Sequence, residues 1–137
     1  MRRTLPGGYE LDDNRRRIDV DAVHAFVGGE SYWAKGRSRE TMDAAIDGSA
    51  RVIGLYAPDG SQVGFARVIS DTATYAYLAD VYVLAEHRGR GLGVELVREA
   101  VEGDPWSKVS WHLRTSNAHK LYEKFGFGPP SERSLER

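Results

Sequence analysis

The stretch HRGRGLG, residues 87–93, holds three glycines and two arginines, and it directly precedes VELVREAVEG, which has the pattern of a helix. A helix N-terminus leaves about four backbone N–H groups without partners and carries roughly half a positive charge. A bare preceding turn lets an anion reach those N–H groups, and arginines add charge-assisted hydrogen bonds. The stretch therefore predicts a phosphate-binding turn; a strand-to-helix turn with solvated arginines is the alternative interpretation.

The glycine spacing excludes two common nucleotide-binding turns. A Walker loop requires Lys-Ser or Lys-Thr after its last glycine, and neither pair follows here. A Rossmann turn requires its third glycine where Val94 or Leu96 stands. The turn is therefore typical of neither ATP nor NAD binding.

The residues before the glycine turn predict an antiparallel sheet. Residues 51–57 and 62–70 are rich in β-formers and are joined by Pro58-Asp59-Gly60, a typical hairpin turn. Residues 75–85 are apolar on both faces except for Asp80, as expected of a central strand. Three consecutive antiparallel strands are therefore expected ahead of the glycine turn.

Helical patterns flank these strands on both sides. Asp19 and Ser38 are suitable N-caps for two helices that end at 28–29 and at Gly48. The other expected elements are a short edge strand at 9–11, a helix after the glycine turn, a strand at 108–114 and a last helix over 118–125. A strand, a helix and a strand in succession imply a parallel pair. We expect one α/β domain over residues 1–137, with a mixed, mostly antiparallel sheet and helices on both faces.

Composition narrows the functional classes. The 137 residues carry 19 basic and 20 acidic side chains, so nucleic-acid binding is not expected. The absence of cysteine excludes disulfides, a thiolate nucleophile and cysteine-ligated zinc, and we expect no metal. Charged residues follow Met1, and no apolar run has membrane-spanning length, so we expect a cytoplasmic protein without membrane contact.

Two motifs together resemble those of a known superfamily. Arg88, Gly91 and Gly93 give the pattern R-x-x-G-x-G between an apolar strand and a helix, which is similar to the pyrophosphate-binding motif of the GNAT superfamily of acyl-CoA N-acyltransferases. That superfamily has a tyrosine on its final helix ahead of an aromatic-Gly-Phe turn, and NAHKLYEKFGF supplies Tyr122 and residues 125–127. The order of elements matches from about residue 8 to residue 127.

The resemblance implies a co-substrate, acetyl-CoA, and a set of residues that bind it. The glycine turn would hold the pyrophosphate, Val81 and Val83 would pair with the pantetheine arm, and a strand bulge near Val83 would free an N–H for the developing oxyanion. Asn117 lies two residues after Thr115, which stands where the superfamily often has an asparagine for the pantetheine. The implied coenzyme-binding residues are Val81, Val83, Arg88, Gly89, Arg90, Gly91, Leu92, Gly93 and Asn117.

The implied reaction is transfer of the acetyl group to a primary amine by direct attack. Tyr122 matches the general-acid position, because a phenol is protonated at neutral pH and can donate to the leaving thiolate; on the helix alone it also fits a core position. Asp80 is a candidate base, with a strand-end carboxylate paired to an arginine as the alternative interpretation. His112, Tyr77 or a chain of waters are competing routes for the proton.

The loop ESYWAKGR, residues 30–37, is expected beside the acceptor. Tyr32 and Trp33 would flank an amine and Glu30 would attract its charge; alternatively Trp33 packs the first helix onto the sheet and the basic residues are solvated. The acceptor itself stays open between a small-molecule amine, such as a polyamine or an amino acid, and a protein amine.

Three further hypotheses remain. One is a non-catalytic acyl-CoA-binding module. Another is a toxin-like enzyme that acetylates aminoacyl-tRNA, for which Arg2-Arg3 and residues 15–17 would supply basic charge. The third concerns assembly: the superfamily usually adds strands after the position of Phe127, so part of the acceptor wall is either short or completed by a second subunit in a homodimer.

Overall fold

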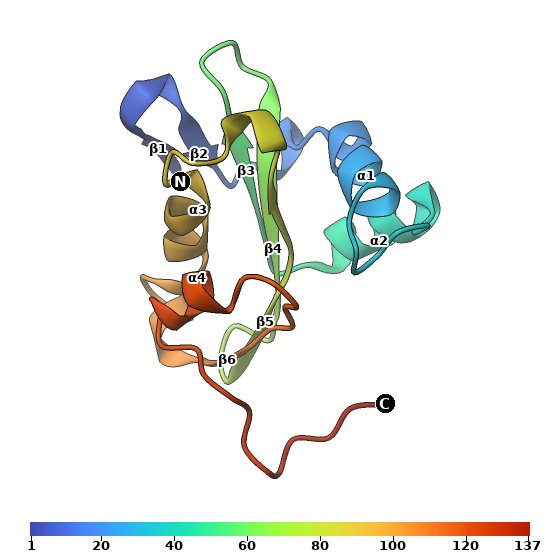
Figure 1. Ribbon diagram of the computed structural model, residues 1–137, viewed down its shortest axis with the longest axis vertical. Helices are drawn as coiled ribbons and strands as arrows, with labels where there is room; N and C mark the ends of the chain where they lie inside the picture. The colour runs from blue at the N-terminus through green and yellow to red at the C-terminus, as the bar shows by residue number, and fades with distance from the viewer.

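The three apolar runs in the middle of the chain pair side by side at the centre of a six-stranded sheet in the computed structural model, which describes all 137 residues (Figure 1). These strands are β3 (Arg51–Tyr56), β4 (Gln62–Ser70) and β5 (Tyr75–Val83), and neighbours run antiparallel. β6 (Ser110–His112) pairs with β5 in parallel. The expected mixed, mostly antiparallel sheet is confirmed.

An N-terminal hairpin extends the sheet beyond the expected strands. β1 (Arg2–Thr4) pairs with β2 (Glu10–Asp12), which in turn pairs with β3. The predicted edge strand around Tyr9–Leu11 thus exists one residue later, but β1 covers its outer edge. The strand order is β1-β2-β3-β4-β5-β6.

Helices cover both faces of the sheet, as predicted. α1 (Val20–Gly29) and α2 (Arg39–Gly48) lie on one face, while α3 (Leu92–Val101) and α4 (His119–Glu123) lie on the other (Figure 1). Asp19 accepts a hydrogen bond from the Ala22 N–H, and Ser38 accepts one from the Thr41 N–H, so both predicted N-caps are confirmed. None of the helices is long and apolar enough to cross a bilayer.

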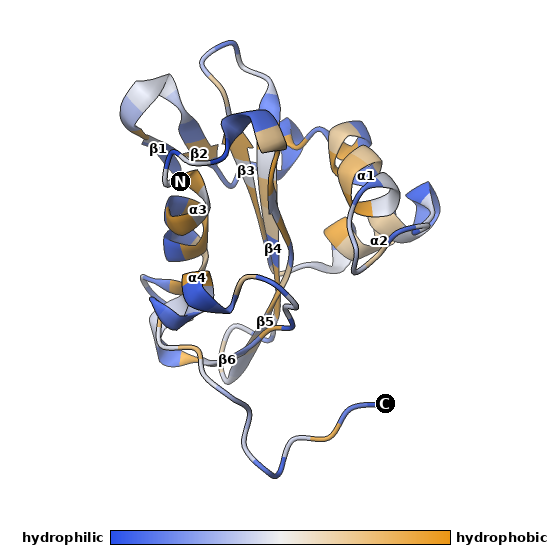
Figure 2. Cartoon of the chain, viewed as in Figure 1, coloured by the Kyte–Doolittle hydropathy of each residue, from blue (hydrophilic) through white to orange (hydrophobic).

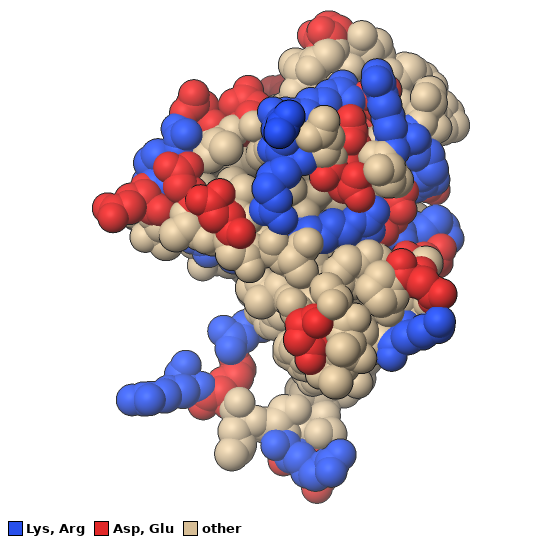
Figure 3. Space-filling view, turned by 180° about the vertical axis from the view of Figure 1, so that it is seen from behind, with Lys and Arg blue, Asp and Glu red and all other residues tan.

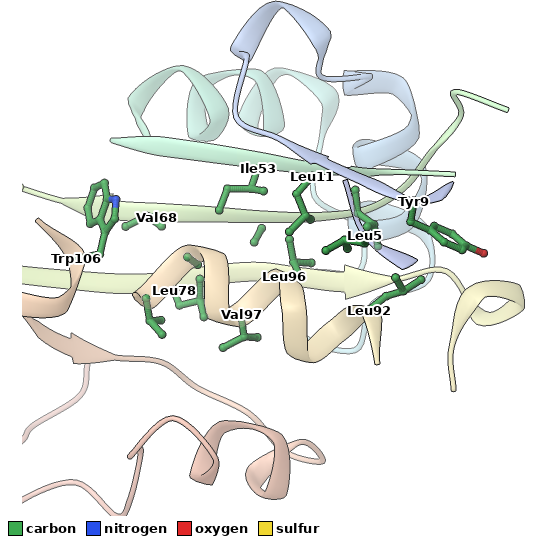
Figure 4. Packing of buried hydrophobic residues seen from close by; sticks show 14 of the residues in the cluster. Leu5, Tyr9, Leu11, Ile53, Val68, Leu78, Leu92, Leu96, Val97 and Trp106 are labelled. Atoms are coloured by element: carbon green, nitrogen blue, oxygen red, sulfur yellow. The ribbon is translucent and has the colours of Figure 1, made fainter. Parts of the chain in front are cut away.

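The core consists of two layers separated by the sheet. In the larger layer, Leu92, Leu96 and Val97 of α3 belong to one buried cluster with the sheet residues Ile53 and Leu78 (Figure 4). The smaller layer packs α1 and α2 against the opposite face through residues such as Val23, Val27 and Met42, which are fully buried. The apolar stripes of these helices accordingly turn toward the strands (Figure 2).

The C-terminal elements are shorter than expected. The predicted strand at 108–114 is reduced to Ser110–His112, because residues 106–108 form a 3-10 turn. The predicted helix over 118–125 is α4 alone, which ends where Gly126 adopts a φ of +86° and Phe127 N–H bonds back to the Tyr122 carbonyl. Residues 128–137 leave the body of the molecule without a helix or strand (Figure 1).

Candidate active site

A cleft of about 510 Å³ opens where the end of β5, the glycine turn, α4 and the α1–α2 loop meet. Its volume is in the range of small-molecule sites. Eleven of the predicted site residues line it: Tyr32, Trp33, Val81, Val83, Arg88, Gly89, Gly91, Leu92, Gly93, Asn117 and Tyr122. Two predicted residues, Asp80 and Arg90, are not in its wall.

The glycine turn supplies free backbone donors to this cleft. Gly89 and Gly91 have φ angles of +79° and +77°, a region that glycine adopts without steric cost. Gly91 is the N-cap of α3 and has no side chain to cap the helix, and the first α3 hydrogen bond runs from the Glu95 N–H to the Gly91 carbonyl at 3.2 Å. The N–H groups of residues 92–94 are therefore free for an anion.

The two arginines of the turn have different surroundings. Arg88 lines the cleft, and its Nε donates to the Val83 carbonyl at 2.8 Å, which ties the turn to the end of β5. Arg90 lies instead over the ring of Tyr9, with its guanidinium carbon 6.0 Å from the ring centroid. Of the two, only Arg88 is positioned for a ligand in the cleft.

β5 is bulged and partly unpaired where it borders the cleft. Phe65 of β4 pairs with Tyr82 and Arg67 pairs with Ala79, so β5 carries one extra residue between these pairs. Asp80 takes up the irregularity with a φ of +54°. The expected bulge is thus present, although it lies three residues before Val83.

The outer edge of β5 is open at the same place. β6 pairs only with residues 75–77, so residues 78–83 have no strand on that side. Val81 and Val83 of this open stretch line the cleft. An extended ligand arm could therefore lie along this edge and bond to the backbone as a strand does.

Tyr122 belongs both to the core and to the cleft. It is 8% exposed, packs in the larger core layer and contacts Phe127 edge to face, with ring centroids 5.9 Å apart. Burial, together with the nearby Tyr32, raises the pKa of Tyr122 to about 12. The phenol is therefore protonated throughout the neutral range and can donate a proton into the cleft.

Thr115 and Asn117 have different surroundings at the start of α4. The Thr115 hydroxyl accepts hydrogen bonds from the Ala118 N–H at 3.0 Å and the Asn117 N–H at 3.4 Å, so it organises the approach to α4. The Asn117 side chain is left to line the cleft.

Tyr32 bridges the two sides of the cleft. Its hydroxyl accepts a hydrogen bond of 2.8 Å from the Ser116 N–H, which joins the α1–α2 loop to the segment before α4. Partial burial raises the pKa of Tyr32, but hydrogen bonds from Ser116 and Thr115 outweigh that effect and lower its pKa overall. Tyr32 and Tyr122 line the same cleft, and the role predicted for Tyr32, to flank an amine acceptor, stays a prediction.

Trp33 connects the cleft to Asp80. Its indole packs on Phe26 of α1, with ring centroids 6.3 Å apart, and its Nε1 donates to Asp80 Oδ1 at 2.8 Å. Trp33 therefore both packs α1 onto the sheet and walls the cleft.

Asp80 is a buried ion-pair partner. Its Oδ2 accepts from Arg67 Nε at 2.6 Å and from Arg37 Nη1 at 2.7 Å. Burial raises the pKa of Asp80, but the arginines and the Trp33 hydrogen bond outweigh it, so its pKa lies below the usual value. Such a carboxylate is a weak proton acceptor, which favours the alternative interpretation of Asp80 as an arginine partner over that of a base.

Sequence reasoning did not anticipate several residues of the cleft. His87 lies in its wall, with Nδ1 2.8 Å from the Tyr9 hydroxyl, and its place inside the glycine stretch was the available signal. The others come from elements whose faces only the fold reveals: Phe26, Ser31, Tyr82, Val94, Ala118 and Leu121.

Comparisons with known proteins point to one family. The sequence model of the acetyltransferase (GNAT) domain matches residues 48–129, more than half of the chain. A Gibberella zeae protein provisionally named as an acetyltransferase is 30% identical over an aligned length of 142. The alignment covers 88% of this chain and 79% of that protein.

Solved structures agree with this match. A Xanthomonas campestris pv. campestris protein assigned to the GNAT family is 40% identical, with a TM-score of 0.87 over 94% of this chain and 92% of that chain. A Deinococcus radiodurans structure provisionally named as an acetyltransferase shares the fold, with 23% identity and a TM-score of 0.73 over 100% of this chain and 94% of that chain. The chain belongs to the GNAT acetyltransferase family.

Proposed function

We propose that this protein transfers the acetyl group of acetyl-CoA to a primary amine by direct attack of the amine on the thioester. The observation that carries the proposal is the meeting, in one cleft, of free α3 N–H groups, an open β5 edge and a buried protonated tyrosine. The N–H groups suit the pyrophosphate, the β5 edge suits the pantetheine arm, and the tyrosine suits the leaving thiolate.

The residues of the cleft fit acetyl-CoA along its length. The free N–H groups of residues 92–94 and the Arg88 guanidinium would hold the pyrophosphate. A Cβ at Gly91 would project into open space, which is the space a phosphate needs to approach the backbone. Val81 and Val83 would bond to the pantetheine arm, with Asn117 on its other side.

Tyr122 would protonate the thiolate as it leaves. The Tyr122 pKa is raised to about 12, so the tyrosine is protonated at neutral pH and has a proton to donate. Because an ordinary thiol has a pKa near 8.5, the transfer is uphill unless the phenolate is stabilised as it forms. A primary alkylamine has a pKa near 10 and must lose a proton before attack. Because Asp80 is held ionised between two arginines, we propose that a chain of waters accepts that proton, and that Asp80 positions Trp33 and the bulge.

Replacement of Tyr122 by phenylalanine tests the reaction. We expect amine-dependent release of CoA to fall by about 100-fold or more, since general acid catalysis contributes at least that much. Calorimetry should show unchanged affinity for CoA, because the ring keeps its packing. A protein that binds CoA but releases none with any amine would instead be the non-catalytic module.

Four of the five arginines in the two basic runs have protein partners, which argues against a basic track for RNA. Arg2 and Arg17 pair with Glu10, Arg3 pairs with Glu95, and Arg15 donates to carbonyls at the end of α2. Basic and acidic side chains also interleave over the face seen in Figure 3. These pairings disfavour the tRNA hypothesis, and retention on RNA at physiological salt would revive it.

We also retain two proposals about the setting of the protein. One is a cytoplasmic location, which microscopy of a tagged chain tests. The other is a homodimer in which a second copy walls the hollow of about 1330 Å³ between β6, α4 and the C-terminal tail. Light scattering across a dilution series tests the dimer.

A further inference from the structure

Two guanidinium groups share a single carboxylate on the α1–α2 face of the sheet. Arg67 of β4 and Arg37 of the α1–α2 loop both donate to Asp80 Oδ2, and the Asp80 side chain is 2% exposed. No other carboxylate forms an ion pair with either arginine. The cluster of these three residues therefore carries an excess of one positive charge.

The cluster has donors to spare. The other hydrogen bonds of the two arginines are a long contact of 3.5 Å from Arg67 Nη1 to Ser49 Oγ and one of 3.8 Å from Arg37 Nη1 to Met42 Sδ. Arg37 Nε and Nη2 and Arg67 Nη2 have no protein partner, yet the only fully buried side-chain atom without one is Gln62 Nε2. These arginine donors are therefore not fully buried, and the side chains of Arg37 and Arg67 are 21% and 10% exposed.

The cluster lies directly behind the wall of the cleft. Trp33 is the link, because its indole faces the cleft and its Nε1 bonds to the same Asp80 carboxylate. The arginines thus lie one side chain away from the cleft that contains Tyr122.

We propose that Arg37 and Arg67 bind a carboxylate of the acceptor, so that the acceptor is an amine of the amino-acid class. Guanidinium groups match carboxylates in planar, bidentate geometry, and an incoming anion would offset the mutual repulsion of the two cations. A polyamine would bring like charge to a site that is already positive. The inference rests on the proposed acetyl transfer and selects among its possible acceptors.

Matched pairs of amines test this with the wild-type protein. Glycine, β-alanine, 4-aminobutyrate and 6-aminohexanoate are each compared with the n-alkylamine of equal chain length, with CoA release as the readout. We expect the carboxylate to raise kcat/KM by about tenfold or more at the best length, as for a charged hydrogen bond. Equal kcat/KM values within every pair would overturn the proposal.

The variant Arg37→Gln tests whether the cluster causes the preference for acceptors that carry a carboxylate. It should lower kcat/KM about 10- to 100-fold more for the preferred amino acid than for its uncharged partner, because any loosening of the α1–α2 loop affects both acceptors alike. Arg39→Gln is the matched control, because Arg39 is exposed and pairs with Asp21 and Asp43 away from the cleft. A loss of equal size for both acceptors, or an equal loss in the control, would contradict the assignment.

Binding of reaction products separates this inference from the proposed function and needs no variant. Calorimetry in the presence of CoA compares an N-acetyl amino acid with the N-alkylacetamide of equal length. Tighter binding of the acid, without turnover of any amine, would sustain the anion site while the transfer reaction fails. Equal binding of the two amides would refute the anion site even if acetyl transfer is observed.

Discussion

Asp80 combines an unusual backbone conformation with an unusual set of partners. Its φ of +54° is uncommon for a residue other than glycine, yet the carboxylate is fixed by Trp33, Arg37 and Arg67. Because the bulge and the ion pairs coincide at one residue, the carboxylate locks both the strand and the α1–α2 loop. The same contacts that hold it lower its pKa and reduce its value as a base.

Replacing Asp80 by asparagine should destabilise the protein strongly. The change leaves the buried Arg67 and the partly exposed Arg37 without their counter-charge, for which we expect a loss of about 3–5 kcal/mol in the free energy of unfolding. Asp21→Asn is the control, since Asp21 is 85% exposed in its pair with Arg39 and should cost less than about 1 kcal/mol. Urea denaturation measures both.

The lowered pKa of Asp80 also predicts how the stability lost in Asp80→Asn depends on pH. Because the pKa of Asp80 is lowered on folding, its ion pairs stabilise the protein above the unfolded value of about 3.8, and the benefit disappears as pH falls below it. The difference between wild type and Asp80→Asn should therefore shrink from pH 7 to pH 3. An equal difference at both pH values would show that the cost comes from packing.

Arg88 and Arg90 provide a second contrast at the level of single residues. Arg88→Ala should weaken CoA binding by about 1.5–3 kcal/mol, since it removes a charged donor from the cleft. Arg90→Ala should have a smaller effect, because its guanidinium lies over Tyr9. Calorimetry with CoA compares them, and equal losses would mean that Arg90 also reaches the ligand.

At the scale of elements, the glycine turn and α3 act as one binding unit. Gly91→Val should weaken CoA binding severely, because a branched side chain at a φ of +77° strains the N-cap and intrudes where the phosphate must lie. Gly60→Val is the matched control: its φ is +87° in the β3–β4 turn, away from the cleft. Both variants should lose stability, but only Gly91→Val should lose affinity in calorimetry, and unchanged affinity in a folded Gly91→Val protein would contradict the phosphate assignment.

The central elements could be read from the sequence because burial gives them a clear period. α3 is an example, since Leu96, Val97 and Ala100 fall on one face and are fully buried. β1 could not be predicted, because Arg-Arg-Thr has no apolar pattern and is held by pairing with β2 and by ion pairs such as Arg3–Glu95.

In the candidate site, residues that belong to local motifs could be predicted from the sequence, whereas contacts between residues far apart in the sequence could not. The glycine turn and Tyr122 lie within motifs that resemble those of the family, and this resemblance implied that they meet in one site, as they do in the cleft. The two arginines that hold Asp80 come from positions 37 and 67, and nothing in the local pattern of either indicates that contact. The exact position of the bulge was likewise invisible, because its positive φ falls on an aspartate.

At the scale of the whole molecule, buried tyrosines should limit stability in alkaline solution. Burial raises the pKa of Tyr56 and Tyr122 from 10.0 to about 12 and also raises that of Tyr82. Between pH 10 and 12 the unfolded chain has lost protons that the folded chain retains, so stability falls as pH rises, by about 1.4 kcal/mol per pH unit for each such tyrosine. Urea denaturation at pH 9 and pH 11 should show this decline, and Tyr56→Phe should make it shallower; a flat profile would contradict it.

The short contact between β5 and β6 has a consequence for handling the protein without its co-substrate. A strand edge with unsatisfied amides and carbonyls is a template on which other chains can polymerise. Residues 78–83 present such an edge, guarded only by the kink at Asp80 and the neighbouring loops. CoA bound along that edge would cover it as a neighbouring strand does. The protein without CoA should therefore precipitate at a lower temperature than the protein with CoA. The difference in precipitation temperature should exceed the rise in Tm that CoA binding causes.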